Sequence, residues 1–339
     1  MAAHDRKFEA LDGLRGVAAL LVFGFHVQDQ VGQRVIPHGD LSVDLFFILS
    51  GFVVAHAYGG RLRAGWGVRS FMAARLRRLY PLYILGLALG LGVVVLLHGW
   101  SPRLIMLSSI GAFFVPMFLT DPWLYPLNIA SWSLACEFAI NAAYGLIAPN
   151  LTGRRLGFAV AAGAAALAIA VPYHGSSNAG AEGKDILIGY ARVLFGFPTG
   201  VLLYRLYRRG RLQWLAGAPP GLLVAAFVAL ALLPRLSPWL DLLTILAVLP
   251  ALIAAGAQAA EPTGLERRSY AVLAAISYPL YVTHQPVLAA ISGLIKTSVP
   301  SSGLVACCIS AGLLIAVAAE LLFDRPLRQR RKALAAAST

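Results

Sequence analysis

Charged and sulfur-containing side chains are scarce in this sequence of 339 residues. Asp, Glu, Lys and Arg together make up only 13% of the chain, against roughly a quarter of the residues in a typical soluble domain. Hydrophobic residues account for 59%. This composition excludes an ordinary soluble domain and indicates a protein of the lipid bilayer.

Cysteine is also rare. The chain holds Cys136 and the neighbouring pair Cys307 and Cys308, all in apolar segments. Neither a disulfide framework nor the paired spacing of a zinc site is present, so we expect the cysteines to pack in the interior and expect no metal. The net charge is +13, but the basic residues lie in short loops between apolar segments, where they report membrane orientation and not nucleic-acid binding.

Apolar stretches of the length needed to cross about 30 Å of hydrocarbon recur along the whole chain. No polar block between them is long enough to form a separate soluble domain, so we predict an all-α, polytopic membrane helix bundle that occupies residues 1–339 as a single domain. Ten spans are expected, at 14–32, 41–58, 79–98, 130–148, 156–171, 185–204, 217–234, 239–257, 270–291 and 302–323.

The basic residues set the expected orientation. Most of the 28 Lys and Arg residues, including those of the tail 324–339, fall on one side if both termini are cytoplasmic, as the positive-inside rule requires. Segment 104–118 is apolar but short, and counting it as a span would put the later basic loops on the wrong side. We therefore predict a re-entrant or interfacial element there. The first span shows no small-residue cleavage site, so we expect it to be permanent.

Arg15 and His26 lie eleven residues apart in the first span. An eleven-residue step returns nearly to the same face of a helix, about 16 Å further along its axis. Histidine inside a membrane span is costly and is a candidate for function. The alternative is an imidazole that is simply hydrogen-bonded to a neighbouring helix.

Asp44, in SVDLFFILSGF, lies a few residues inside the outer boundary of the second span. Because a short outer loop joins the first two spans, Asp44 and His26 can reach the same depth. A carboxylate that accepts the second N–H of an imidazole fixes its tautomer and raises its basicity, as for a general base. The alternative is that Asp44 is solvated at the outer edge.

Ser133, Glu137 and Asn141 follow one another at four-residue steps in the fourth span and share one helix face. A polar stripe of this kind indicates a lined cavity, although Ser and Asn also hydrogen-bond between helices. An ionised glutamate suits such bonding poorly, so Glu137 is a candidate for catalysis or for orienting a substrate.

His284 stands in ISYPLYVTHQPV, close to Tyr281 and between two prolines that free backbone carbonyl groups. Arg192 lies within another span. Together with His26 and Glu137, these residues predict a shared polar chamber, with His284, Arg192 and Tyr281 lining it or contacting the acceptor.

Arg75 and Arg78 lie one helical turn apart, immediately before Pro81 and the third span. They could be positive-inside anchors. Alternatively, their forked guanidinium groups could hold the phosphates of a cytosolic donor.

The motifs, taken in order, resemble those of the acyltransferase-3 family of integral membrane O-acyltransferases, which are mostly bacterial. The resemblance covers the whole chain and rests on Arg15-x10-His26, SVDLFFILSGF, Arg75-x2-Arg78 before YPLY, SWSLACEF with Glu137, SYPLYVTHQP with His284, and Asp324-Arg325-Pro326. The family usually ends in Glu-Arg-Pro, so Asp324 is a conservative departure.

This resemblance implies ten spans in a bacterial cytoplasmic (inner) membrane and transfer of an acyl group to a carbohydrate hydroxyl. The donor it implies is cytoplasmic acyl-CoA, most often acetyl-CoA, used as a co-substrate with no permanently bound cofactor. The acceptor would be an exopolysaccharide, an O-antigen or a lipid-linked oligosaccharide. The family's essential Arg and His correspond to Arg15 and His26, and its donor-binding arginines to Arg75 and Arg78. Some relatives carry a fused hydrolase-like domain, which we do not expect here.

The resulting hypothesis is that His26 takes the proton of the acceptor hydroxyl as it attacks the thioester, with Asp44 or Glu137 orienting the groups. Arg15 would stabilise negative charge on the donor. A variant in which the acetyl group rests on His26 stays open. The competing hypothesis is a secondary transporter or flippase of a lipid-linked sugar, although no two related halves are visible in the sequence.

Overall fold

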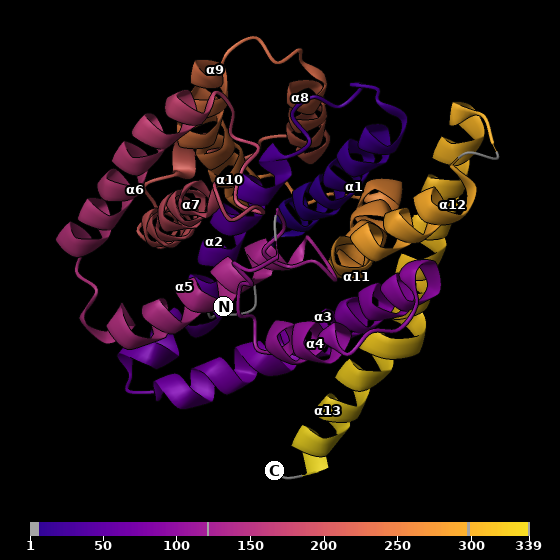
Figure 1. The fold of residues 1–339 in the computed structure, drawn as a ribbon. Coiled ribbons are helices and arrows are strands. Elements are labelled where there is room, and N and C mark those ends of the chain that lie inside the picture. Colours follow the sequence, from indigo (N-terminus) through magenta and orange to yellow (C-terminus); the bar gives the residue numbers. More distant parts are fainter. Residues whose placement is uncertain (1–6, 121, 297–298, 338–339) are drawn as a thin grey trace.

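The computed structural model describes residues 7–120, 122–296 and 299–337, and these residues form helices and loops (Figure 1). Within this part of the chain no strand is present, and the one β-type contact is an isolated bridge between Trp123 and Glu182. The all-α prediction is confirmed.

The helices follow the predicted apolar ranges. In chain order they are α1 (Glu9–Val31), α2 (Leu41–Arg63), α3 (Val68–His98), α4 (Arg103–Ala112), α5 (Ser131–Ile147), α6 (Gly153–His174), α7 (Ile186–Arg208), α8 (Pro220–Leu232), α9 (Pro238–Leu243), α10 (Leu249–Gln258), α11 (Gly264–Ile295), α12 (Ser301–Ala318) and α13 (Arg325–Ala337). Single π-helical segments, Thr244–Val248 and Ala319–Asp324, join α9 to α10 and α12 to α13. Short 3₁₀ turns follow α5 and α7.

Within the described residues, seven helical segments are long and apolar enough to cross a membrane. They are α1, α2, α3, α6, α7, the α9–α10 segment and the segment that begins with α12. The three other predicted spans correspond to α5, α8 and α11. Of these, α5 has 17 residues and α8 has 13, whereas α11 has 32.

The predicted non-spanning segment at 104–118 contains only the ten-residue helix α4. A helix of this length rises about 15 Å, half the thickness of the hydrocarbon layer. It packs along α3, and the following loop is held by a hydrogen bond from Tyr125 Oη to the carbonyl oxygen of Phe114 (2.8 Å). Its length fits the predicted re-entrant or interfacial element, which stays a prediction.

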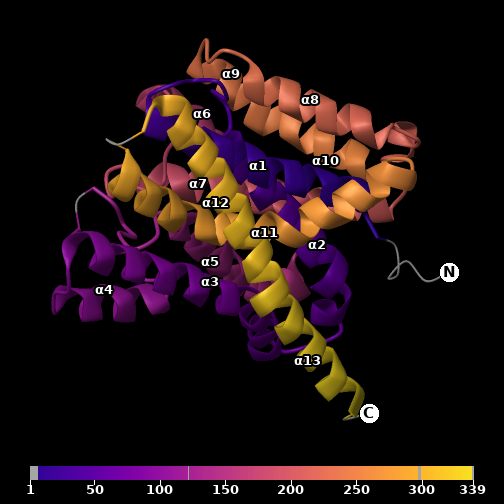
Figure 2. The same cartoon turned by 90° about the vertical axis from the view of Figure 1, so that its right-hand side faces the viewer.

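Some helices are enclosed by their neighbours, and others cover the outside of the bundle. Helix α1 packs along α11, and α2 packs along α7, so that these helices form the middle of the bundle (Figures 1 and 2). Helices α3, α6 and α12 expose most of their apolar surface on the outside. Asp44 of α2 and His284 of α11 are therefore buried in protein, and Arg15 and His26 of α1 are partly buried.

Glycines allow α2 and α7 to approach unusually closely. A Cβ atom on Gly200 of α7 would lie 1.9 Å from the carbonyl oxygen of Ile48, and one on Gly51 of α2 would lie 2.0 Å from that of Phe197. Small residues at a helix interface permit this backbone contact within a membrane. Consequently Asp44 of α2 reaches α7 directly.

We expect Gly200→Ala to lower the free energy of unfolding by about 1–3 kcal/mol, because the added methyl group would overlap backbone atoms of α2, which can move only together with the helix. The measurement is thermal unfolding of the purified protein in detergent. Gly92→Ala in α3 is the matched control, since a Cβ there meets nothing within 4 Å. Equal melting temperatures for the two variants would contradict the close contact.

Candidate active site

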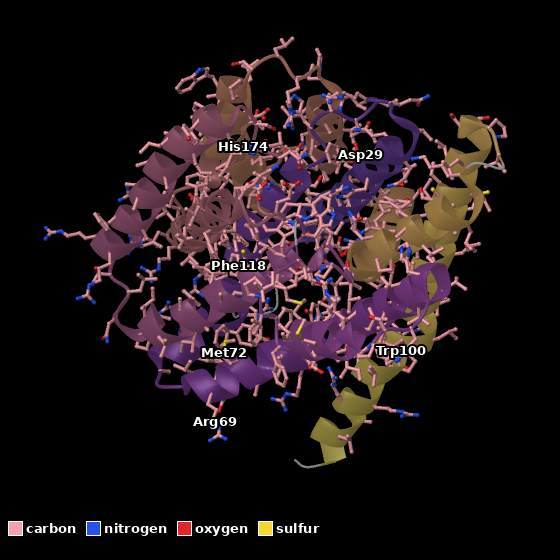
Figure 3. All side chains as sticks on the ribbon, in the orientation of Figure 1. Asp29, Arg69, Met72, Trp100, Phe118 and His174 are labelled. Carbon is pink, nitrogen blue, oxygen red and sulfur yellow. The ribbon has the colours of Figure 1, made fainter. Side chains whose placement is uncertain are left out.

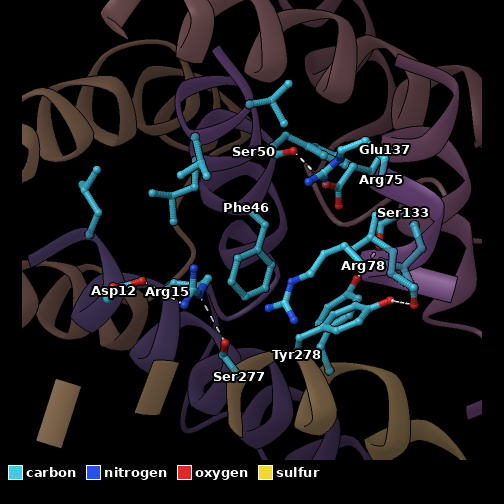
Figure 4. A pocket seen from close by; sticks show the side chains of 18 of the residues that line it. Asp12, Arg15, Phe46, Ser50, Arg75, Arg78, Ser133, Glu137, Ser277 and Tyr278 are labelled. Atoms are coloured by element: carbon cyan, nitrogen blue, oxygen red, sulfur yellow. Dashed lines mark hydrogen bonds and ion pairs between the residues drawn. The ribbon is translucent and has the colours of Figure 1, made fainter. Parts of the chain in front are cut away.

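A chamber of about 360 Å³ lies among α1, α2, α3, α5 and α11 (Figure 4). Its wall is apolar over much of its area, with Leu11, Val43, Phe46, Phe47, Leu49, Val53, Val54, Leu79 and Leu134. The polar lining includes Asp12, Arg15, Ser50, Arg75, Arg78, Ser133, Glu137, Ser277, Tyr278 and Tyr281. Six of the residues predicted for the site from the sequence thus line one cavity. They are Arg15, Arg75, Arg78, Ser133, Glu137 and Tyr281.

Arg15 reaches the chamber from α1. Its Nη2 lies 2.8 Å from Oδ1 of Asp12, and its Nε donates to Oγ of Ser277 on α11 (3.3 Å). The side chain is 36% exposed, so the guanidinium group keeps free surface toward the cavity. Asp12 and Ser277 were missed by sequence reasoning, although the three-residue spacing of Asp12 and Arg15 could have indicated their pairing.

Arg75 and Glu137 form an ion pair in the chamber wall, with 2.7 Å between Nη2 and Oε1. The same carboxylate oxygen accepts a hydrogen bond from Ser50 Oγ (2.7 Å). The sequence suggested separate roles for Arg75 and Glu137, in donor binding and in catalysis. The structure joins them across α3 and α5, so part of the charge of each is already compensated.

Arg78 is the more accessible guanidinium group of the α3 motif, and it points into the chamber (Figure 4). Its side chain is 42% exposed, and Nη1 lies 3.4 Å from Oδ2 of Asp324. Asp324 also accepts from Nη1 of Arg328 (2.5 Å). The carboxylate therefore lies between α3 and the tail helix α13 and holds Arg78 at the cavity.

His26 and His284 lie against each other where α1 packs on α11. Their ring centroids are 5.3 Å apart and the rings are nearly parallel, at 25°. Because Arg15 also contacts α11, both members of the eleven-residue pair face the same helix, which confirms that they share one face. The chamber itself does not include either histidine among its described lining residues.

The two imidazoles have different surroundings. His284 is buried, and its Nδ1 lies 2.7 Å from the carbonyl oxygen of Tyr281. Nδ1 must therefore carry the hydrogen, and Nε2 is an acceptor that has no partner within the described residues. The side chain of His26 is 29% exposed, and its Nδ1 lies 3.7 Å from Oδ2 of Asp29. Asp29 was missed by sequence reasoning.

The predicted contact between Asp44 and His26 is wrong. Asp44 is buried and forms a double hydrogen bond with Arg192 of α7, at 3.0 Å from Oδ1 to Nε and 2.7 Å from Oδ2 to Nη2. Arg192 also donates to the backbone carbonyl groups of Ala179 (2.8 Å) and Asp40 (3.0 Å). Burial of Asp44 equally excludes the alternative of solvation at the outer edge. The close contact of α2 with α7 turns this carboxylate toward the buried cation.

Asn141 and Arg192 lie outside the described chamber lining. Asn141 is buried and donates to the backbone carbonyl of Glu137 (2.7 Å), so it supports its own helix. Ser133 and Tyr281 do reach the chamber, and their hydroxyl oxygens are 2.5 Å apart. Ser133 and Glu137 share a face as expected, but the cavity ends before the next turn.

We expect Asp44→Asn and Arg192→Gln each to lower the free energy of unfolding by about 3–5 kcal/mol, because each leaves a partner unpaired in the interior. The double variant should lose much less than the sum of the two. Denaturant unfolding in detergent measures all three. Additive losses would show that the pair does not act as a unit.

A bundle of apolar helices that encloses paired charges and a basic chamber defines an integral membrane protein with an internal site. The family model described as an acyltransferase domain matches residues 8–321. The chain therefore belongs to the acyltransferase-3 family, which confirms the resemblance seen in the sequence. It is an acyltransferase of groups other than aminoacyl groups.

Two of its relatives match along nearly their full length. Protein 2 in the picA locus of Rhizobium radiobacter is 37% identical over 181 residues, which is 48% of this chain and 94% of the relative. The exopolysaccharide production protein ExoZ of Rhizobium meliloti is 27% identical over 321 residues, 91% of this chain and 95% of the relative.

A third relative, the acyltransferase MdmB of Streptomyces mycarofaciens, is 31% identical over 193 residues, 49% of this chain and 46% of the relative. No solved structure matches the chain.

Proposed function

We propose that this membrane O-acyltransferase transfers an acyl group, most often acetyl, from cytoplasmic acyl-CoA to a hydroxyl group of a carbohydrate. The observation that carries the proposal is the chamber into which α1 and α3 direct Arg15, Arg75 and Arg78. Guanidinium groups bind phosphate oxygens with forked hydrogen bonds and keep their charge at all physiological pH values.

The donor would enter from the side that carries the basic tail helix α13. Arg78 is the best placed residue for a CoA phosphate, since it is the most exposed of the three arginines and is held by Asp324 at a longer distance. Arg75 is ion-paired with Glu137, so the two side chains would form a rigid part of the chamber wall. The apolar part of the lining suits the pantetheine arm, which must be taken out of water to reach the bundle centre.

The chemistry would take place between the chamber and the stacked histidines. The acceptor's hydroxyl oxygen attacks the thioester carbon while His26 takes its proton, and the C–S bond breaks with its electron pair going to sulfur. Asp29, in place of the predicted Asp44, is the carboxylate that lies near Nδ1 of His26. Arg15 would hold negative charge on the donor. In an alternative sequence of steps, the acyl group is first transferred to His26 and then to the acceptor hydroxyl group.

The acceptor would approach from the opposite end, where His26 is partly exposed. The relative in Rhizobium meliloti is named for exopolysaccharide production, which supports a surface carbohydrate as the acceptor class. With both termini in the cytoplasm, the enzyme would span the bacterial cytoplasmic membrane as a single domain. The donor would bind from the cytoplasmic side and the acceptor from the opposite side.

We expect His26→Ala to fold normally and to lose acetyl transfer by at least about 100-fold, because it removes the proton acceptor. The assay follows CoA release from radiolabelled acetyl-CoA by membranes that contain the acceptor. His98→Ala, at the exposed end of α3, is the matched control. Near-normal transfer by the His26 variant, with intact folding, would remove His26 from the reaction.

For Arg78→Gln we expect the KM for acetyl-CoA to rise about tenfold or more with kcat little changed, since a phosphate contact made equally in the ground and transition states is lost. Arg69→Gln is the control, because Arg69 is exposed on the same helix and points away from the bundle (Figure 3). An unchanged KM in the Arg78 variant would assign Arg78 to membrane anchoring.

A further inference from the structure

Tyr281 connects the chamber with the histidine pair. Its side chain lines the chamber, and its ring centroid lies 5.7 Å from that of His284. His284 in turn stacks on His26. Tyr281 therefore lies both at the chamber and beside the histidine pair.

The ring of Tyr281 is held in place. It is 7% exposed and packs edge to face against Phe46, with 5.5 Å between the ring centroids. The backbone of the same residue accepts the Nδ1 hydrogen of His284 at 2.7 Å. One residue therefore fixes both the position of a hydroxyl group at the chamber and the tautomer of the adjacent imidazole.

The Tyr281 hydroxyl group is a donor whose present acceptor can be replaced. Oη lies 2.5 Å from Oγ of Ser133. Ser133 uses its own hydrogen toward the carbonyl oxygen of Ala130 at 3.2 Å, so Tyr281 donates to Ser133. Serine oxygen is a neutral acceptor, and an oxygen atom that gains negative charge accepts the same hydrogen more strongly.

Other donors of the lining have acceptors of a different kind. Tyr278, one turn earlier on α11, donates to the backbone carbonyl of Leu79 at 2.7 Å. Arg15 and Arg75 are ion-paired with carboxylates at 2.8 and 2.7 Å. Arg78, 42% exposed and 3.4 Å from Asp324, is the residue proposed for the CoA phosphate. The Tyr281 hydroxyl group pairs instead with a second hydroxyl group at the cavity surface.

We propose that Tyr281 is a catalytic residue whose hydroxyl group donates a hydrogen bond to the carbonyl oxygen of the acyl thioester. The inference rests on the proposed function. As the acceptor oxygen bonds to the carbonyl carbon, the C=O π pair moves onto the carbonyl oxygen, and Tyr281 stabilises this oxyanion without losing its proton. When the pair returns, the C–S bond breaks and CoA leaves with the sulfur pair, while the hydroxyl proton goes to His26.

The test compares Tyr281→Phe with Tyr270→Phe. Both changes remove one oxygen atom from a tyrosine of α11 and keep the ring, but Tyr270 donates to Glu266 (2.9 Å) and is not among the chamber's described lining residues. We expect Tyr281→Phe to lower kcat by roughly 100- to 1,000-fold, the loss typical of one oxyanion donor, with the KM for acetyl-CoA unchanged. Tyr270→Phe should lower kcat by less than about threefold. A Tyr281→Phe enzyme within about threefold of wild-type kcat overturns the proposal.

Ser133→Ala separates catalysis from a structural role. If the bond between Tyr281 and Ser133 only supports the fold, both partners' variants lower kcat and the melting temperature alike, and the proposal is rejected. If Tyr281 is the oxyanion donor, Ser133→Ala lowers kcat far less than Tyr281→Phe. Absence of acetyl transfer by the wild-type protein would reject the proposed function itself, whereas full activity of Tyr281→Phe would reject this inference alone.

Discussion

The pairing of guanidinium groups with carboxylates inside the helix bundle is the interaction on which the structure depends. A lone charge within a bilayer is costly, and the cost falls when an opposite charge and further hydrogen bonds accompany it. Arg192 obtains both from α2 and the loops, through Asp44 and two backbone carbonyl groups. Arg75 obtains an opposite charge from Glu137, whose Oε1 also accepts a hydrogen bond from Ser50. These pairs join α2 to α7 and α3 to α5, and the second of them forms part of the chamber wall.

The contact of α1 with α11 then sets where chemistry can occur. It brings Arg15 to Ser277 and His26 to His284, so that one helix pair carries a cation at one level and two imidazoles at another. A substrate with phosphates at one end and a reactive carbonyl group at the other would match this separation. Under the proposed function, binding and reaction would take place at two levels along the bundle, with Tyr281 between them.

The sequence predicted much of this arrangement because helical periodicity and hydrophobic length are local properties. The ranges of the helices, the common face of Arg15 and His26, and the chamber position of Ser133 and Glu137 all follow from spacing along one helix. The partners of these side chains on other helices could not be predicted from spacing along one helix. Asp44 is near enough in sequence to pair with α1, yet its choice of Arg192 depends on the contact of Gly51 and Gly200 with backbone atoms, which is a tertiary property.

The same limit applies to Arg75 and Glu137, which are separated by 62 residues and meet only when α3 and α5 pack. Asp29 and Tyr281 illustrate two different cases. Asp29 lies one turn from His26, so a helical-spacing argument could have found it. Tyr281 was expected at the cavity, but its hydrogen-bond partner came only from the position of α5.

Asp324 links two parts of the protein that are far apart in the chain. It ends the π-helical joint between α12 and α13, and it contacts Arg78 of α3 and Arg328 of the tail helix. A protein domain or affinity tag attached beyond α13 would thus act, through Arg328 and Asp324, on Arg78, the residue proposed to bind the donor. The carboxyl terminus is consequently a poor place for a fusion partner, even though it lies far from the reacting atoms.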